Sequence, residues 1–149
     1  IYDPTTPNSM PHAGTFNNNV LSMYAGICAM TEAFTPDIAA RLHATGDAFR
    51  TRVNGVFEQH DVALHACGTG SLMNLHGVTG PVRTIDDVAD SNDAAKELLF
   101  LDLLERGFYV ARRGFVALSS VLTDAELDDF ITTLDDVVAL RKSVLAPRA

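Results

Sequence analysis

The sequence predicts an α+β fold in which a small sheet is covered by helices. Strand-like runs occur in closely spaced pairs around glycine turns, and longer runs with helical spacing of apolar residues separate these pairs. The chain has 149 residues, of which 47% are hydrophobic and 20% are charged. This length suits one ordinary domain, and this composition supplies a core and excludes a disordered chain.

The first two predicted elements are a proline-rich loop and a buried helix. Residues 1–15 contain repeated prolines, which fix the backbone and remove hydrogen-bond donors, so we expect an extended loop there. From Asn17 the sequence NNNVLSMYAGICAMTEAF follows, in which five larger apolar residues recur at helical spacing: Val20, Met23, Tyr24, Ile27 and Met30. This helix is apolar nearly all round, which predicts that it is buried.

The second predicted helix begins at Thr35-Pro36-Asp37 and runs to about Gln59. Threonine caps the helix, proline suits its first position, and aspartate suits the positive end of the helix dipole. Two strands, 62–67 and 71–76, are predicted after it around the turn Gly68-Thr69-Gly70.

A third helix is predicted from about 91 to 106, where Gly107 ends it. Two further strands, 108–111 and 115–119, then flank the turn Arg112-Arg113-Gly114. The segment Thr123-Asp-Ala-Glu126 is a capping box, which predicts the start of the last helix.

Charge and composition exclude several classes of function. The net charge of −8 argues against a nucleic-acid partner, because phosphate binding needs clustered lysine and arginine. No run of eighteen apolar residues occurs, so no membrane span is predicted. Cys28 and Cys67 lie far apart without a CxxC spacing, and we expect buried free thiols in a reducing cytoplasm. The chain starts at Ile1 in a Pro-rich stretch, which is typical of the middle of a longer protein.

Two short segments could bind anions. Gly14-Thr15 precedes a capped helix and offers a backbone N–H, a hydroxyl and a positive helix end, which together can cradle a phosphate. The residues alone favour a simpler interpretation, a turn with a capping threonine. Arg112-Arg113 on a tight connection could bind a carboxylate through a planar guanidinium, or both arginines could be solvated, or one could pair with an acid such as Glu105.

Other reactive residues give no site. His65, Cys67 and His76 fall on adjacent predicted strands, but their spacing matches no zinc pattern, so we interpret them as strand residues and predict no metal site. The two lysines, Lys96 and Lys142, are expected on solvated helix faces. We therefore predict no catalytic residue in this chain, and no lysine suited to hold a cofactor.

Three segments in order resemble the class III aminotransferases and glutamate-1-semialdehyde aminomutases. They are HAGTFNNNVLSMYAG, GTGSLMNLH and LLERGFYVARRGFVALSSVLTDAELDDFI, which together cover nearly the whole chain. The first is the most specific, with Gly-Thr-Phe, two variable residues and an Asn before a helix rich in Met, Ala and Gly. The sequence departs from many relatives at Asn19-Val20, where they carry Asn-Pro.

The resemblance implies the C-terminal part of a fold-type I pyridoxal-phosphate enzyme. Residues 1–34 would then be a remnant of the large domain and residues 35–149 the small domain. Gly14 and Thr15 would bind the cofactor phosphate of the partner subunit in a homodimer, with active sites at the subunit interface. Either Arg112 or Arg113 would bind the substrate carboxylate.

The resemblance also implies the reaction. The parent enzyme would transfer an amino group between an amino acid and a 2-oxo acid, and relatives acting on β-amino acids are most similar around the arginine pair. The cofactor lysine would lie in the remaining, N-terminal part of the same enzyme. Two alternatives stay open: an aminomutase of the glutamate-1-semialdehyde type, and a non-catalytic binding or assembly domain.

Overall fold

The computed structural model describes residues 3, 5–10, 14, 16 and 19–147. The chain divides into two compact units, Ile1–Ile38 and Ala39–Ala149. The expected division at residue 34, with a large-domain remnant before it, stays a prediction.

The first unit contains helix α1, Val20–Cys28, which continues into a π-helical turn, η1, Ala29–Ala33. The Asn19 side chain caps α1 by accepting a hydrogen bond of 3.1 Å from the backbone N–H of Ser22. The prediction that this helix is buried is wrong for the chain by itself, because every residue of α1 and η1 is exposed. An apolar pattern all round a helix indicates that the helix packs against other surfaces, but it does not show which chain supplies them.

Helix α2, Pro36–His60, confirms the predicted second helix, and the Thr35 hydroxyl accepts a hydrogen bond of 3.4 Å from the Ile38 N–H. The sheet has the order β1-β2-β3 and is antiparallel throughout, with β1 at His65–Thr69, β2 at Leu72–His76 and β3 at Phe115–Ala117.

The β1–β2 turn lies later than predicted. Thr69 pairs with Leu72, so only Gly70 and Ser71 connect the strands, while Gly68 stays in the ladder. Gly70 has φ +52°, a conformation that suits glycine in a two-residue hairpin turn.

One predicted strand is absent from the described part of the chain. Residues 108–111 form no strand and share one backbone hydrogen bond with β3, from the Ala111 N–H to the Phe115 carbonyl at 3.2 Å. Phe108 packs instead against Phe130 in an edge-to-face pair with ring centroids 5.3 Å apart. The apolar run therefore indicated burial correctly, but burial does not require strand pairing.

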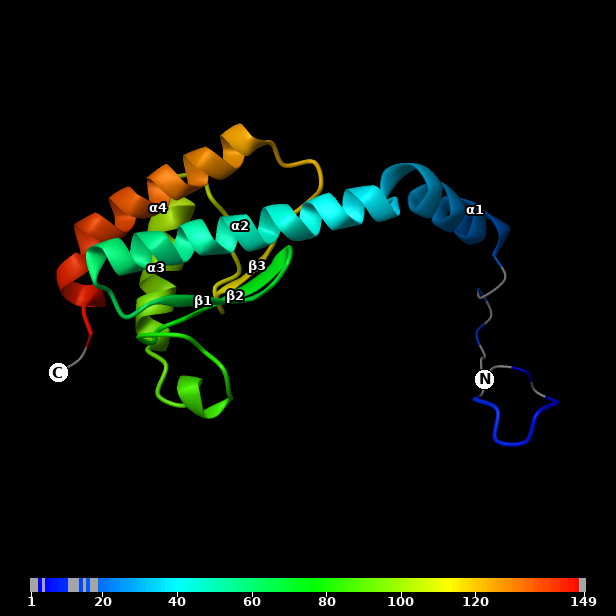
Figure 1. Ribbon diagram of the computed structural model, residues 1–149, viewed down its shortest axis with the longest axis horizontal. Helices are drawn as coiled ribbons and strands as arrows, with labels where there is room; N and C mark the ends of the chain where they lie inside the picture. Colours follow the sequence, from blue (N-terminus) through cyan, green and yellow to red (C-terminus); the bar gives the residue numbers. More distant parts are fainter. Residues whose placement is uncertain (1–2, 4, 11–13, 15, 17–18, 148–149) are drawn as a thin grey trace. The chain divides into compact units, whose positions relative to one another are not determined.

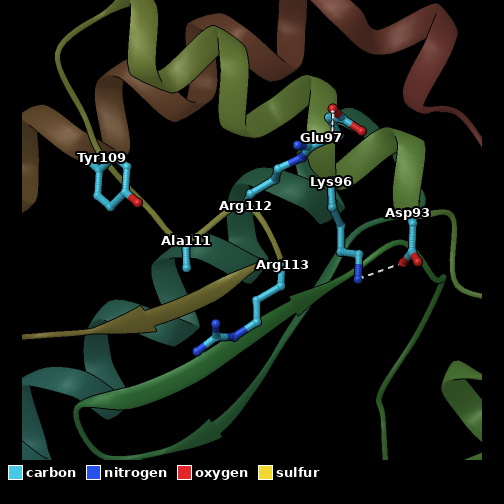
Figure 2. Close-up of a pocket in the computed structure, with 7 residues that line it drawn as sticks. All are labelled: Asp93, Lys96, Glu97, Tyr109, Ala111, Arg112 and Arg113. Atoms are coloured by element: carbon cyan, nitrogen blue, oxygen red, sulfur yellow. Dashed lines mark hydrogen bonds and ion pairs between the residues drawn. The ribbon is translucent and has the colours of Figure 1, made fainter.

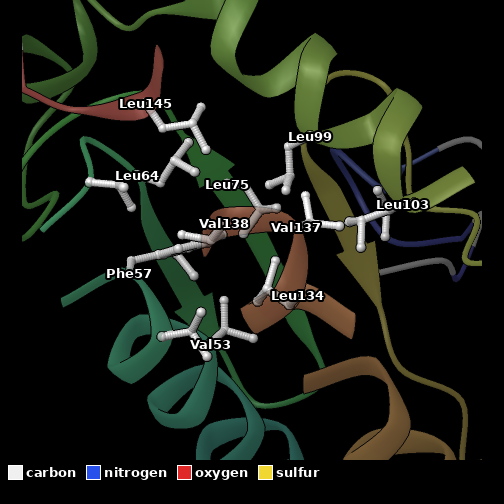
Figure 3. Close-up of a cluster of buried hydrophobic side chains, with 14 of the residues drawn as sticks. Val53, Phe57, Leu64, Leu75, Leu99, Leu103, Leu134, Val137, Val138 and Leu145 are labelled. Atoms are coloured by element: carbon white, nitrogen blue, oxygen red, sulfur yellow. The ribbon is translucent and has the colours of Figure 1, made fainter. Parts of the chain in front are cut away.

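Helices α3, Asp93–Glu105, and α4, Asp124–Leu145, complete the second unit (Figure 1). Both predicted ends are confirmed: Gly107 follows α3 with φ +90°, and the Thr123–Glu126 capping box opens α4. The core joins these helices and α2 to the sheet (Figure 3), and its fully buried large side chains are Phe57, Leu99, Leu103, Leu134, Leu145, Val53, Val137 and Val138. The observed architecture confirms the α+β prediction.

Two pairs of polar contacts fix the edges of this core. Asp102, 4% exposed, accepts two hydrogen bonds from Arg141, which joins α3 to α4. The Asn54 side chain accepts from the Ala66 N–H at 2.8 Å and donates to the Ala66 carbonyl at 2.9 Å, so it pairs with the free edge of β1.

The loop between β2 and α3 is closed at its base. The Asn92 N–H donates to the Gly77 carbonyl, and the Gly77 N–H donates to the Ser91 hydroxyl, both at 2.9 Å. Residues 78–90 between these contacts are mostly exposed and contain one 3-10 turn, η2, Asp86–Val88.

None of the helices in the described ranges is long and apolar enough to cross a membrane.

Candidate functional site

The turn that carries the arginine pair is fixed to the sheet. The Gly114 N–H donates to the Ala111 carbonyl at 2.7 Å, and the Leu75 N–H of β2 donates to the Gly114 carbonyl at 2.9 Å. Gly114 has φ +94°, and a Cβ atom at this position would lie 2.5 Å from the Leu75 carbonyl oxygen. Glycine is therefore needed for the turn to lie this close to β2.

An open cavity of about 530 Å³ lies between this turn and α3 (Figure 2). Its lining residues come from the first two turns of α3 and from the segment before β3: Asp93, Lys96, Glu97, Tyr109, Ala111, Arg112 and Arg113.

Two of the three cations in the cavity are neutralised by carboxylates of α3. Arg112 forms an ion pair with Glu97, and the Nζ atom of Lys96 lies 2.8 Å from an Asp93 carboxylate oxygen. The hydrogen bond from Lys96 lowers the pKa of Asp93, which keeps this carboxylate charged.

The prediction that Lys96 is solvated is wrong. Its side chain is 13% exposed, and its Nζ atom points toward Asp93 (Figure 2). Lys142 is exposed, as predicted.

Arg113 differs from its neighbour. Its guanidinium carbon lies 5.5 Å from the centroid of the Phe115 ring, a cation–π arrangement. In Figure 2 the Arg112 side chain reaches α3, while the Arg113 side chain points away from it along the strands. Within the part of the chain that the structure describes, no carboxylate forms an ion pair with Arg113. It is therefore the cation of this cavity that can accept an external anion without breaking a pair.

An apolar cavity of about 240 Å³ shares Tyr109 with the arginine cavity. Its other lining residues come from α2, α4 and the segment around β3: Phe49, Phe108, Val110, Val116, Ala117, Leu118, Leu122, Glu126, Leu127 and Phe130. The charged cavity and the apolar cavity thus meet at Tyr109.

Sequence reasoning found the two arginines but missed Asp93, Lys96, Glu97 and Tyr109. The segment DAAKE places the two acids and the lysine within one helical turn, which was a usable signal of a charged face. The acid that pairs with Arg112 is Glu97, not Glu105, and sequence spacing does not show this, because the contact joins two elements.

The predicted phosphate cradle is described only in part. Gly14 is exposed, and Thr15 lies outside the described residues. The N-cap of α1 is Asn19. The role of Gly14 and Thr15 in binding phosphate stays a prediction.

The histidines and cysteines form no metal site among the described residues. His65 and His76 are directly opposite on β1 and β2, and burial lowers the pKa of both, with the Lys96 charge adding to the shift at His76.

The expectation of buried thiols is wrong: Cys28 is exposed and Cys67 half-buried. Both are free, and burial raises the pKa of Cys67.

No family model matches the chain. The chain is 41% identical over its whole length to a β-phenylalanine transaminase from Variovorax paradoxus, of which it covers 34%. The crystal structure of a β-phenylalanine aminotransferase from that organism superposes with a TM-score of 0.90 at 39% identity, over 99% of this chain and 34% of that one. A glutamate-1-semialdehyde 2,1-aminomutase from Limosilactobacillus reuteri is 28% identical over 138 residues, which are 91% of this chain and 32% of the aminomutase. The chain spans about a third of the length of the curated relatives it matches.

Proposed function

We propose that this chain is the C-terminal part of a pyridoxal-phosphate-dependent aminotransferase. The chain belongs to the class III aminotransferases and is about a third as long as its relatives. The observation that carries this proposal is the match to a β-phenylalanine transaminase along the whole chain. The whole enzyme would transfer an amino group between an amino acid and a 2-oxo acid.

Within this enzyme, Arg113 binds the substrate carboxylate. The support is the charge balance of the cavity, where Glu97 neutralises Arg112 and Asp93 neutralises Lys96. The Arg113 guanidinium can donate two parallel hydrogen bonds to a carboxylate and so fix the orientation of the substrate.

The neighbouring apolar cavity supports a substrate with an apolar or aromatic side chain. Tyr109 lines both cavities, so a β-amino acid held at Arg113 could place an aryl group on the Phe108 and Phe130 side. This assignment agrees with the name of the relative from Variovorax paradoxus, a β-phenylalanine transaminase.

Pyridoxal phosphate would be held mainly by other parts of the enzyme. Neither lysine of this chain suits the cofactor, since Lys96 is paired with Asp93 and Lys142 lies on an exposed face of α4. Gly14 and Thr15 would contribute hydrogen bonds to its phosphate across the interface of a homodimer. When bound, the cofactor supplies an electron sink that this chain lacks.

The exposed apolar helix α1 supports the dimer. Exposed side chains of α1 and the following turn η1 include Leu21, Tyr24 and Met30, at 80%, 68% and 65%, and burying them in a subunit or domain interface would be favourable. The two free thiols agree with a location in the reducing cytoplasm.

An aminomutase remains the second candidate, because the chain also matches a glutamate-1-semialdehyde 2,1-aminomutase. The two reactions differ in their need for a second substrate. An aminotransferase stops after one half-reaction at each active site when no 2-oxo acid is supplied, whereas an aminomutase continues.

Kinetics of the intact enzyme test the arginine assignment. Arg113→Ala should lower kcat/KM for a β-aryl amino acid by a factor that corresponds to about 2–5 kcal/mol, while kcat/KM for the matching amine without a carboxylate stays nearly unchanged. Arg112→Ala should have a much milder effect. Wild-type efficiency of both variants with the carboxylated substrate would show that the turn is structural.

A further inference from the structure

The Glu97–Arg112 ion pair connects the arginine turn to α3. On its other side the turn is already tied to β2 through Leu75 and Gly114. Arg112 and Glu97 have side-chain exposures of 68% and 45%, so their pair lies at the rim of the cavity and not in the core. An exposed pair contributes little to global stability, which leaves a local role for it.

Helix α3 is a fixed support for this contact. Leu99 and Leu103 are at most 1% exposed on the core side of α3. Asp102 ties the helix to Arg141 of α4, and the Asn92 N–H ties its start to Gly77. Glu97 therefore presents its carboxylate from a helix held at several points.

We propose that Glu97 is a positioning residue for the substrate carboxylate. Glu97 holds Arg112, Arg112 holds the 111–114 turn against α3, and the turn presents Arg113 to the substrate. This inference rests on the proposed function, in which Arg113 binds the carboxylate. Glu97 itself touches neither substrate nor cofactor.

Positioning and simple charge predict opposite results for Glu97→Gln. This substitution removes one negative charge beside the cavity, so a purely electrostatic role predicts tighter binding of a carboxylate. A positioning role predicts weaker binding, because the released turn no longer holds Arg113 in one place. The sign of the change separates the two roles.

The test uses the intact enzyme with a β-aryl amino acid, the matching amine, and 3-phenylpropionate as a carboxylate inhibitor without an amino group. Glu97→Gln should raise the KM of the amino acid and the inhibition constant of 3-phenylpropionate about three- to fivefold, the range that an exposed ion pair can contribute. The amine should react as with the wild type. Glu97→Asp should restore part of the affinity, and Glu105→Gln, on the same helix but outside the cavity, should match the wild type.

The double variant Glu97→Gln, Arg112→Ala tests whether Glu97 acts through Arg112. If Glu97 acts through Arg112, adding Glu97→Gln to Arg112→Ala should change neither constant further. Tighter carboxylate binding by Glu97→Gln, an equal loss for the amine, or a full effect in the Arg112→Ala background would each overturn the proposal.

Hydrogen exchange of the turn separates this proposal from the proposed function. Backbone amides of residues 111–114 should exchange faster in Glu97→Gln than in the wild type without any substrate present. If Arg113→Ala leaves kcat/KM for the carboxylated substrate unchanged, the assignment of Arg113 to the carboxylate fails, whatever the result of hydrogen exchange. If Arg113→Ala behaves as expected and exchange in Glu97→Gln is unchanged, the positioning role alone fails.

Discussion

The carboxylate of Asp102 accepts hydrogen bonds from both the Nε and the terminal nitrogen of Arg141, at 2.8 and 2.9 Å. Thirty-nine residues separate the two side chains, and the contact joins α3 to α4 beside the core. Hydrogen bonding from Arg141 lowers the pKa of Asp102 below its ordinary value.

This pair predicts an acid-sensitive stability. A carboxyl with a lowered folded-state pKa stabilises the fold fully above its unfolded-state pKa of about 4, and the contribution is lost as pH falls through the folded-state pKa. Asp102→Asn should therefore cost about 1–3 kcal/mol in the free energy of unfolding at neutral pH, and its deficit should shrink below about pH 4. Urea unfolding at several pH values measures this, and a deficit independent of pH would contradict it.

Thr15 is predicted to face a subunit interface and to contact the cofactor phosphate there. In the intact enzyme, Thr15→Ala should weaken cofactor binding about ten- to a hundredfold, because one hydrogen bond to a charged group contributes roughly 1.5–3 kcal/mol. Dialysis followed by absorbance of the retained cofactor gives the affinity. Thr5→Ala is a suitable control, and unchanged retention in Thr15→Ala would count against the assignment.

The lysines of this chain are predicted not to hold pyridoxal phosphate. Lys96 is paired with Asp93 and its side chain is 13% exposed, so it presents no free amine, and Lys142 lies on an exposed helix face without an activating neighbour in the described structure. The isolated chain, mixed with the cofactor and reduced with borohydride, should carry no stoichiometric label after peptide mapping. Full labelling of Lys96 or Lys142 would exclude this prediction.

Asn54 is predicted to protect the free edge of β1. Asn54→Leu leaves both backbone groups of Ala66 without their side-chain partner and should lower the free energy of unfolding by about 1–3 kcal/mol. Asn54→Asp can still accept from the Ala66 N–H but cannot donate to its carbonyl, so it should lose less. Chemical denaturation gives the free energy of unfolding of the wild type, Asn54→Leu and Asn54→Asp. Equal stability of all three would show that water replaces the hydrogen bonds of the Asn54 side chain.

The helices could be predicted from the sequence because their ends carry local signals. Thr35-Pro36 begins α2, Gly107 follows α3, and Thr123 with Glu126 opens α4, each through contacts within a few residues. The predicted strand at 108–111 failed because strand pairing depends on a distant partner, and here Phe108 packs on α4 instead.

The candidate site could be predicted only to the level of residue type. A pair of arginines on a turn indicated an anion, but not which of the two is available. That distinction depends on Glu97, which is fifteen residues away and reaches Arg112 only after α3 has packed beside the turn. The Asp102–Arg141 contact was missed for the same reason.

The closed base of the loop between β2 and α3 makes its interior a suitable place for engineering. Because Gly77 bonds to both Ser91 and Asn92, the two ends of the loop stay together whatever lies between them. Lengthening a loop whose ends are already joined adds little entropic cost, since that cost grows only with the logarithm of loop length. An affinity tag or a fluorophore inserted near the exposed Ile85 would leave the hairpin and the start of α3 in register.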